Sequence, residues 1–418
     1  MFALVDANAF YCSAEQVFRP DWRGKPIIVL SNNDGMVVAA NRQAKDVGIK
    51  KCKPYFAMRD LCEQKGVIAC SSNYELYGDL SAKMMEVIGR FAPDQYIYSI
   101  DESFLSFQRC QQAIPDLTAH AQALRKAVWK ECRLPVCVGM GSTLTLAKVA
   151  NHAAKKMEAY QGVCVLRTDT ARRTVLSAMD VQDVWGIGPR TAKQLRIMGV
   201  RSALQLAEIP PALARKNFNV EIERTVRELN GEACKGWGEA RADKQQIFST
   251  RSVGDRIVCA ETLSQALCRQ GHIAAEKLRQ QGSLCQHMMV FASNSPFDEK
   301  PVTRRFQYRF AYPTDDTCTL MQVIAKAVAE LFVPGVRFYK LGVGLIDLVD
   351  GSHAQFDLFD PHANNLALMK AFDGLNAKYG TGTVFMAAQG TTPKWTMRRD
   401  RLTPQYTTRW HDIPTIRC

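Results

Sequence analysis

The sequence lacks the features that mark membrane-spanning, exported and zinc-binding proteins. It contains no apolar run of about 18 residues, the length that suggests a membrane-spanning helix. Its start, MFALVDANAF, lacks the basic region and small-residue cleavage site of a signal peptide. The 14 cysteines form no CxxC pair, so the sequence contains neither a typical zinc-binding motif nor a redox motif. We therefore expect a cytoplasmic protein with free, mostly buried thiols and no membrane partner.

Internal repeats and a disordered composition are also missing. Hydrophobic residues make up 47% of the chain, charged residues 23% and aromatic residues 9%, which is ordinary for a globular protein. At roughly 100 to 200 residues per domain, the length of 418 residues predicts about two to four domains.

Positive charge is present in excess. The chain carries 54 Lys and Arg against 41 Asp and Glu, a net charge of +13. Residues 101–200 carry 14 basic and 8 acidic side chains, whereas residues 201–240 carry 6 of each. An excess spread over several segments fits a long track of phosphates better than a single basic tail. On composition alone, a protein that is simply basic fits equally well.

Hydrophobic spacing predicts a mixed core in the first 170 residues. A strand begins at Phe2 and ends near Glu15, and further strands are expected at 26–30, 96–107 and 135–140. The strand region 96–107 consists of two short strands joined at an acidic point. Helices are expected at 37–47, 72–92, 117–132 and 143–157. This order indicates an α+β or α/β core.

The remainder divides into three parts. Residues 171–240 are predicted to be helical. Residues 247–349 show the order strand, helix, strand, strand, helix, strand, which is a split βαβ unit of ferredoxin-like type. Residues 233–246, polar and interrupted by Gly236 and Gly238, are the expected linker before it. Residues 351–418 have little periodicity and a basic end.

Three carboxylates stand in strand-like surroundings: Asp6, Asp101 and Glu102. Successive strand residues point to opposite faces, so two adjacent acids can serve one site only where the strand bends. Bridging carboxylates can hold two Mg²⁺ ions for phosphoryl transfer. On these residues alone, a solvated hairpin turn stays open as the alternative.

Five segments, taken in order, resemble the Y-family translesion DNA polymerases. They are LVDANAFYCSAE, NNDGMVVAANRQAK, YSIDESF, VGMGSTLTLAKVANHAAKK and VWGIGPRTAKQL. Within that family they are most similar to the UmuC-like catalytic subunits of bacterial DNA polymerase V and their plasmid-borne relatives. Several motifs in one register are far more specific than any single motif.

The resemblance implies an α+β fold, a right-hand-like polymerase with a ferredoxin-like palm. The palm covers residues 1–170 with small fingers inserted at about 19–75. A helical thumb with a helix-hairpin-helix follows at 171–238, and a βαββαβ little finger at 245–350. Residues 351–418 form a tail with a clamp-binding peptide and a partner-binding region.

The resemblance also assigns the active-site residues. Catalysis and the two Mg²⁺ ions fall to Asp6, Asp101 and Glu102, with the main-chain carbonyl of Ala7 as a further metal ligand. Tyr11 occupies the steric-gate position that selects deoxynucleotides, with Phe10 beside it. The residues implied to hold the triphosphate of the dNTP substrate are Arg42, Lys45 and Lys155.

DNA binding is expected in two places. In VWGIGPRTAKQL, Gly186 and Gly188 let backbone N–H groups approach a phosphate, and Arg190 and Lys193 add positive charge. In the little finger, TRRFQYRF supplies further phosphate contacts. Arg305 and Arg309 share one strand face, whereas Arg304 points the other way, so we assign the contacts to the first two.

The tail contains QFDLF, which is similar to the bacterial sliding-clamp peptide and would bind through Gln355, Leu358 and Phe359. The resemblance further implies a processed UmuD-type dimer and a RecA filament as partners. The expected function is error-prone synthesis on primed, damaged DNA in SOS-type mutagenesis, without proofreading, by a nucleoid-associated cytoplasmic enzyme. A catalytically inactive DNA-binding subunit is the main alternative, and a nucleotide cyclase with a similar palm is another.

Overall fold

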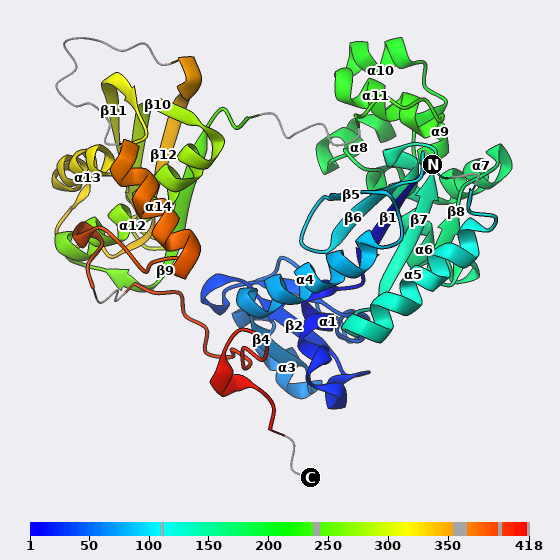
Figure 1. The fold of residues 1–418 in the computed structure, drawn as a ribbon, viewed down its shortest axis with the longest axis horizontal. Helices are drawn as coiled ribbons and strands as arrows, with labels where there is room; N and C mark the ends of the chain where they lie inside the picture. The colour runs from blue at the N-terminus through cyan, green and yellow to red at the C-terminus, as the bar shows by residue number, and fades with distance from the viewer. Residues whose placement is uncertain (109, 111–112, 237–242, 354–365, 392–394, 416–418) are drawn as a thin grey trace. The chain divides into compact units, whose positions relative to one another are not determined.

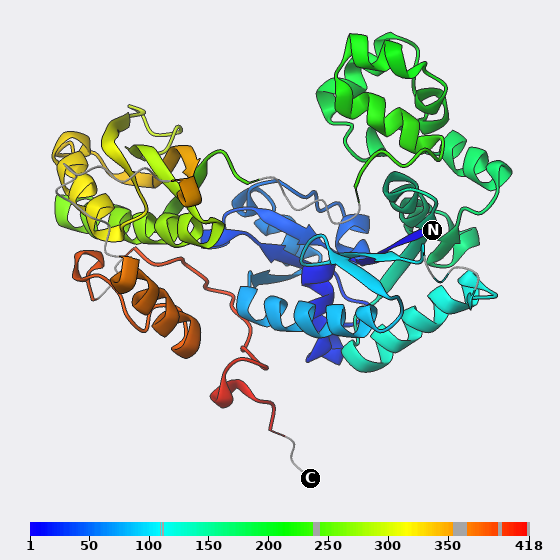
Figure 2. The same ribbon diagram turned by 45° about the horizontal axis from the view of Figure 1, so that its top comes forward.

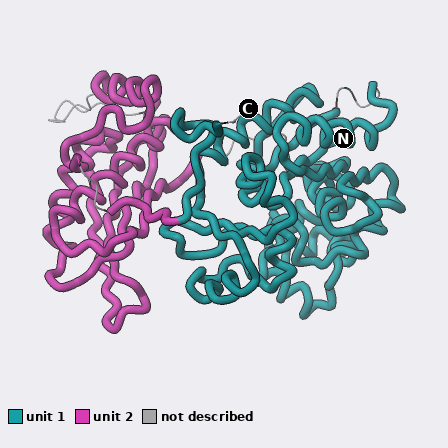
Figure 3. The backbone as a smooth tube through the Cα atoms, turned by 90° about the horizontal axis from the view of Figure 1, so that it is seen from below, with its two compact units in different colours: residues 1–240, 401–418 teal, residues 241–400 magenta. Residues whose placement is uncertain are grey.

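The structure is a computed structural model that describes residues 1–108, 110, 113–236, 243–353, 366–391 and 395–415. The chain forms two compact units (Figure 3). The first comprises residues 1–240 and 401–418, and the second comprises residues 241–400. Within the described ranges, no helix combines the length and the apolar character needed to cross a membrane.

A five-stranded sheet, in the order β5-β6-β1-β7-β8, forms the centre of the first unit (Figure 1). Its strands are β1 (Phe2–Ala7), β5 (Asp94–Ile97), β6 (Glu102–Ser106), β7 (Val136–Gly141) and β8 (Val163–Val165). β1 pairs antiparallel with both β6 and β7, and Asp6 lies opposite Glu102. The two short strands expected around the acidic point are therefore confirmed as β5 and β6.

Helices cover both faces of this sheet. α4 (Tyr74–Gly89) and α5 (Leu117–Cys132) pack on the face that carries Ala3 and Val5. α6 (Leu144–Lys156) packs on the face that carries Leu4. Because side chains alternate along a strand, Asp6 points to the same side as Leu4 and therefore toward α6.

A close approach anchors α6 to the sheet. A Cβ atom at Gly139 of β7 would lie 1.9 Å from the backbone N of Asn151, so only glycine fits there. The buried Asn151 side chain donates hydrogen bonds to the carbonyls of Leu4 at 3.2 Å and Cys137 at 2.9 Å. This contact fixes the height and rotation of α6 over the end of β1.

The strand predicted from residue 2 stops earlier than expected, at Ala7. The chain turns at Ala9, whose φ of 47° and ψ of 52° lie in the left-handed region, and α1 (Phe10–Val17) follows. Ser13 stabilises the turn, because its hydroxyl donates to the carbonyl of Asn8 at 2.6 Å. The alternation of apolar residues continued past the turn and concealed it from the sequence prediction.

A second, three-stranded sheet lies in the first unit in the order β3-β2-β4. Its strands are β2 (Ile27–Leu30), β3 (Val37–Ala40) and β4 (Ile68–Ser71), and its helices are α2 (Arg42–Asp46) and α3 (Arg59–Gln64). The helix predicted at 37–47 is thus wrong over its first half. The β-branched Val37 and Val38 favour a strand, and the helix begins only after Asn41, whose side chain accepts the N–H of Ala44 at 2.9 Å.

The region predicted to be helical after residue 170 is helical. It contains α7 (Asp169–Ala178), α8 (Pro189–Ile197), α9 (Ala203–Ala207), α10 (Pro211–Asn217) and α11 (Val220–Leu229). The buried carboxylate of Glu228 joins α11 to the start of α6. It accepts the hydroxyl of Thr145 at 2.6 Å and the backbone N–H of Thr145 at 2.9 Å.

The second unit confirms the predicted βαββαβ order. Its sheet has the order β11-β10-β12-β9. The elements are β9 (Ile247–Ile257), α12 (Ala260–Gln281), β10 (Ser283–Ser293), β11 (Thr303–Thr314), α13 (Thr317–Leu331) and β12 (Phe338–Asp350). α12 and α13 pack on one face of the sheet, where Val290 and Val343 lie in the core.

The tail is more ordered than its weak periodicity predicted. α14 (Leu366–Tyr379) packs against α12 on the side away from the strands, the orange and lime helices of Figure 2. Arg279 of α12 donates to both carboxylate oxygens of Asp373, at 2.7 and 2.9 Å. The rings of His272 and Phe372 lie 5.4 Å apart. From residue 401 the chain belongs to the first unit again.

Candidate active site

Three carboxylates gather where β1 ends and β6 begins. Asp6 lies opposite Glu102, and the N–H of Ala7 donates to the carbonyl of Asp101 at 3.0 Å. The turn before β6 is held by Ser99, whose hydroxyl donates to Asp101 Oδ1 at 2.7 Å and accepts the N–H of Glu102 at 3.1 Å. The adjacent acids therefore sit at a bend, as the sequence required for a shared site.

Two lysines of α6 hold two of these acids. Lys148 and Lys155 are about two helical turns apart, so they share one face of the helix. Lys155 Nζ lies 2.5 Å from Asp6 Oδ2. Lys148 Nζ lies 3.0 Å from both carboxylate oxygens of Glu102. The close approach of α6 at Gly139 thus brings each ammonium group to its carboxylate.

The environment of Asp6 favours a bound cation. Burial raises its pKa to about 6, and the charges of Glu102 and Asp101 add to the rise, while Lys155 opposes it. A carboxyl group in this state gains from a positive ion that offsets both the burial and the neighbouring charges.

The oxygen atoms available at this site are of the type that magnesium prefers as ligands. Carboxylates and main-chain carbonyls are hard oxygen ligands, which suit Mg²⁺ and Mn²⁺ better than zinc. Among the described residues, no three His, Cys, Asp or Glu side chains form a preformed metal cluster. Asp6 and Glu102 are instead paired with lysines, and a metal ion would have to compete with Lys155 for Asp6.

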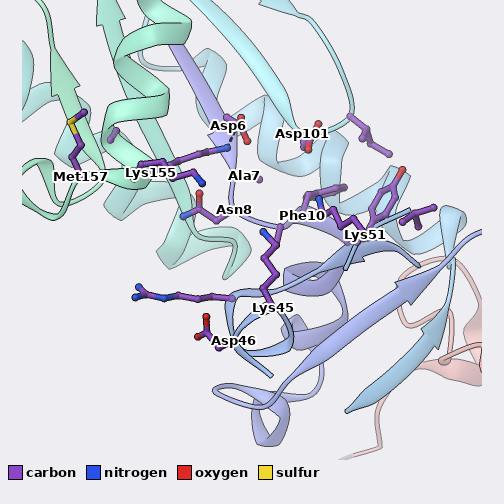
Figure 4. A pocket seen from close by; sticks show the side chains of 18 of the residues that line it. Asp6, Ala7, Asn8, Phe10, Lys45, Asp46, Lys51, Asp101, Lys155 and Met157 are labelled. Carbon is purple, nitrogen blue, oxygen red and sulfur yellow. Dashed lines mark ion pairs between the residues drawn. The ribbon is translucent and has the colours of Figure 1, made fainter. Parts of the chain in front are cut away.

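A cavity of about 890 Å³ lies beside the acids (Figure 4). Asp6 and Asp101 form part of its wall, and Lys155 points at Asp6. Glu102 does not line it and faces Lys148 instead. The cations that line the cavity are Arg42, Lys45, Lys51, Lys155 and Lys156.

The cations of the cavity repel one another. Burial lowers the pKa of Lys45, and the charges of Lys51, Lys156 and Lys155 lower it further. A polyanion in the cavity would relieve that repulsion. The structure brings the three predicted triphosphate ligands, Arg42, Lys45 and Lys155, to this one cavity.

The two predicted aromatic residues also reach the cavity. The turn at Ala9 starts α1 so that Phe10 and Tyr11 both line it. The ring of Tyr11 stacks on the ring of Tyr77 in α4, with 4.6 Å between the centroids and 17° between the planes. The position of Tyr11 therefore depends on α4 as well as on α1.

Family models cover most of the chain. The impB/mucB/samB family model matches residues 5–152, and the model of that family's C-terminal domain matches residues 244–358. Residues 367–416 match a domain of unknown function, DUF4113. Protein SamB of Salmonella typhimurium is 42% identical over 427 residues, which cover 100% of both chains. Protein UmuC of the same species is 41% identical, also over 100% of both chains.

The chain belongs to the impB/mucB/samB family. It is a UmuC-like member of the Y family, as the five sequence segments indicated. A more distant relative is DNA polymerase IV of Moorella thermoacetica, which is 26% identical over 92% of this chain and 94% of its own length.

Solved structures confirm the predicted fold class. A Y-family DNA polymerase chimera of Dbh and Dpo4 aligns with a TM-score of 0.65 at 18% identity, covering 84% of this chain and 99% of the chimera. The insertion ternary complex of Dbh DNA polymerase aligns with a TM-score of 0.54 at 17% identity. At this identity the likeness establishes the fold, the α+β arrangement of Y-family polymerases.

The predicted DNA-binding residues of the first unit lie apart from the acids. Gly186 has a φ of 89°, a conformation that favours glycine, and Gly188 caps α8. Arg190 and Lys193 follow on exposed positions of that helix. Neither the glycines nor the cations line the cavity, so any role of theirs concerns DNA at a distance from the reacting atoms.

In the second unit, strand alternation places the arginines of β11 as predicted. Phe306 and Tyr308 pack toward the core, and Arg305 and Arg309 are exposed on the opposite face, away from α12 and α13. Arg304, next to Arg305 on the strand, points to the other face of the sheet. The clamp-peptide residues Gln355, Leu358 and Phe359 lie outside the described residues.

Sequence reasoning missed several polar residues of the site. Among them are Ser99, Lys148, Lys51 and Lys156. Ser99, Lys148 and Lys156 stand inside the quoted segments, and the spacing of Lys148 from Lys155 could have revealed Lys148. Lys51 lies outside those segments and could have been found only as a basic residue close to Lys45 in the sequence.

Proposed function

We propose that this chain extends DNA primers across damaged template by two-Mg²⁺ nucleotidyl transfer, with Asp6, Asp101 and Glu102 holding the metal ions. It is a DNA-directed DNA polymerase of the UmuC-like, error-prone translesion type. The observation that carries the catalytic proposal is the cavity that brings Asp6 and Asp101 together with five cations.

The acids would supply the metal ligands, together with the main-chain carbonyl of Ala7. When bound, the Mg²⁺ ions would activate the primer 3′-hydroxyl and stabilise the leaving pyrophosphate. The bend held by Ser99 keeps Asp101 directed at the same region as Asp6. The acids thus fix where the hydroxyl and the α-phosphate meet.

The lysines would bind the triphosphate of the dNTP. Lys155 Nζ lies 2.5 Å from Asp6 Oδ2, and its ammonium group would contact the dNTP if this ion pair opened. Lys45 and Lys51 lie across the cavity from it. Cations around the β- and γ-phosphates stabilise the charge that develops as the bond to the α-phosphate breaks.

Tyr11 would select the sugar. Its ring lines the cavity and rests on Tyr77, which is fully buried and limits how far the ring can retreat. A 2′-hydroxyl on the incoming nucleotide would collide with the ring, so the site would prefer deoxynucleotides.

Phosphate contacts from both units would hold the primed, damaged duplex without reading its sequence. We assign them to Gly186, Gly188, Arg190 and Lys193 in the first unit and to Arg305 and Arg309 in the second. The further partners we propose are a sliding clamp, bound through Gln355, Leu358 and Phe359, a processed UmuD-type dimer and a RecA filament. We place the enzyme in the cytoplasm, on the nucleoid.

Primer extension past an abasic site tests the catalytic proposal. The full chain is assayed with Mg²⁺, a UmuD-type dimer and activated RecA, beside Asp101→Asn/Glu102→Gln and the control Asp79→Asn on the exposed side of α4. We expect extension by the native chain and the control, and none by the double variant. Equal extension by the double variant would refute the role of the acids. Loss of extension in every sample with DNA binding retained would favour a non-catalytic DNA-binding subunit.

A further inference from the structure

We propose that residues 401–406, near the C-terminus, position Tyr11 and thereby help the site to reject ribonucleotides. The inference rests on the proposed function, because it assigns a support to the proposed steric gate. It gives a role in substrate selection to part of the region that matches a domain of unknown function.

The segment is bound to the edge of the three-stranded sheet. The N–H of Ser71, at the end of β4, donates to the carbonyl of Arg401 at 3.0 Å, and the N–H of Arg401 donates to Ser71 Oγ at 2.9 Å. Tyr406 stacks on Phe18, just after α1, with 4.7 Å between the ring centroids. The segment therefore touches the strand that leads into α4 and the end of α1.

Asn73 links the segment to the start of α4. Its side-chain N–H groups donate to the carbonyl of Thr403 at 3.1 Å and to Thr403 Oγ1 at 3.0 Å. Its side-chain oxygen accepts the N–H of Leu76 at 3.4 Å and so caps the helix. Asn73 is fully buried, and these contacts couple the segment to the first turn of α4.

The next contacts lead to the aromatic ring behind the cavity. Tyr77, one turn into α4, donates its hydroxyl to Glu15 Oε1 of α1 at 2.6 Å. Burial raises the pKa of Glu15, whereas Tyr77 and the Thr403 hydroxyl lower it. Glu15 Oε2 has no hydrogen-bond partner among the described residues, so within them Tyr77 is the hydrogen-bond donor that holds this buried carboxylate.

Tyr77 positions Tyr11 through ring stacking. The two rings are nearly parallel and 4.6 Å apart, and Tyr77 is fully buried while Tyr11 lines the cavity. If the Thr403 hydroxyl is lost, Asn73 loses an acceptor at the cap of α4, and Tyr77 shifts with the first turn of that helix. Because a steric gate acts by close contact, a small shift of Tyr11 would relax sugar selection before it impairs dNTP binding.

Single-nucleotide incorporation by the full chain tests the inference, under the same conditions as primer extension. The measured quantity is the ratio of kcat/KM for a ribonucleotide to kcat/KM for the matching deoxynucleotide. We expect Thr403→Val to raise this ratio about threefold to tenfold while dNTP incorporation stays within about threefold of the native value. The matched control is Thr407→Val, the same substitution at an exposed position four residues on.

Two further variants separate positioning from folding. Tyr77→Phe keeps the stacked ring and removes the donor to Glu15, so it should raise the ratio in the same direction even if Thr403→Val folds poorly. Tyr11→Ala should raise the ratio strongly, and Thr403→Val should add nothing in that background, because the ring it positions is gone.

The variants distinguish an error in the proposed steric gate from an error in the proposed role of residues 401–406. If Tyr11→Ala leaves the ratio unchanged, the proposed gate itself is wrong. If Tyr11→Ala raises the ratio but Thr403→Val and Tyr77→Phe match the Thr407→Val control, the inference is overturned and the gate stands. An equal fall in kcat/KM for the ribonucleotide and the deoxynucleotide in Thr403→Val and Tyr77→Phe would also overturn the inference. It would show that these residues only maintain the folded structure.

Discussion

At the scale of single residues, the acids of the site are organised by their lysine partners. Lys148 holds both oxygens of Glu102, and its ammonium group also lies 4.5 Å from the ring centroid of Tyr98 and 5.1 Å from that of Trp185. The aromatic rings limit the positions open to the ammonium group. Glu102 is thereby kept in one orientation although it does not line the cavity.

Replacing Lys148 should slow catalysis without abolishing DNA binding. We expect Lys148→Met to lower kcat about 10- to 100-fold, the usual range for residues that orient metal ligands. Lys148→Arg should recover part of the loss, since it keeps the charge. Pre-steady-state incorporation would measure the effect, with the exposed Lys126→Met on α5 as control. Equal rates for Lys148→Met and the control would contradict the assignment.

Lys51 should contribute to nucleotide binding. It lines the cavity, whereas its neighbour Lys50 is exposed and does not. We expect Lys51→Met to raise the KM for dNTP about tenfold with a smaller change in kcat, because a phosphate contact is lost. Steady-state incorporation at varied dNTP concentration gives both constants, and Lys50→Met is the matched comparison. A larger effect at Lys50 would place the triphosphate elsewhere.

At the scale of elements, the seating of α6 on the sheet decides whether the lysines reach the acids. A methyl group at Gly139 would press on the backbone of Asn151, which cannot move like a flexible side chain. We expect Gly139→Ala to lower the free energy of unfolding by about 3 kcal/mol or more. Gly78→Ala, in the exposed face of α4 with open space around it, should raise it by about 0.5 to 1 kcal/mol. Urea denaturation compares the two, and similar values for both would refute the packing argument.

The contact between α12 and α14 should weaken in acid. Burial lowers the pKa of His272 to about 4, the charges of Arg269 and Arg279 lower it further, and Asp373 opposes them. The unfolded chain, with the ordinary histidine pKa near 6.5, therefore binds more protons between about pH 6.5 and 4. Stability is complete above that window and falls as the pH drops through it.

Hydrogen exchange of α12 and α14 would detect this loss. We expect faster exchange at pH 5 than at pH 7.5 after correction for the intrinsic rates, and a smaller pH effect in His272→Leu, which cannot titrate. A pH effect of the same size in the variant would assign it to other groups.

At the scale of the whole molecule, the net charge of +13 should make DNA binding strongly dependent on salt. Each phosphate contact adds close to one unit to the slope of log K against log salt concentration. We expect Arg305→Ala and Arg309→Ala each to reduce that slope by about 1, and Arg304→Ala, with the other strand parity, to leave it unchanged. Binding titrations at several salt concentrations test this. An unchanged slope in Arg305→Ala and Arg309→Ala would show that this face of the sheet does not contact DNA phosphates.

Much of this molecule could be predicted from its sequence, for identifiable reasons. α5 and the βαββαβ unit have long, regular hydrophobic spacing, so their order and limits were close to those observed. The turn at Ala9 and the strand at Val37–Ala40 were missed, since one depends on a left-handed residue and the other on antiparallel pairing with β2. The partner of Lys148 likewise depends on the packing of α6, which no local pattern encodes.

The second unit is an insertion within the first, because residues 401–418 rejoin the first unit after residues 241–400. This arrangement constrains how such genes can recombine. A single crossover between two relatives in the linker would replace the second unit and residues 401–406 together, and would set a foreign segment against the native Ser71, Asn73 and Phe18. Two crossovers, one on each side of the second unit, would exchange the second unit alone and keep residues 401–406 with their own binding surface. Natural or engineered hybrids of the second kind should therefore retain sugar selection more often than hybrids of the first.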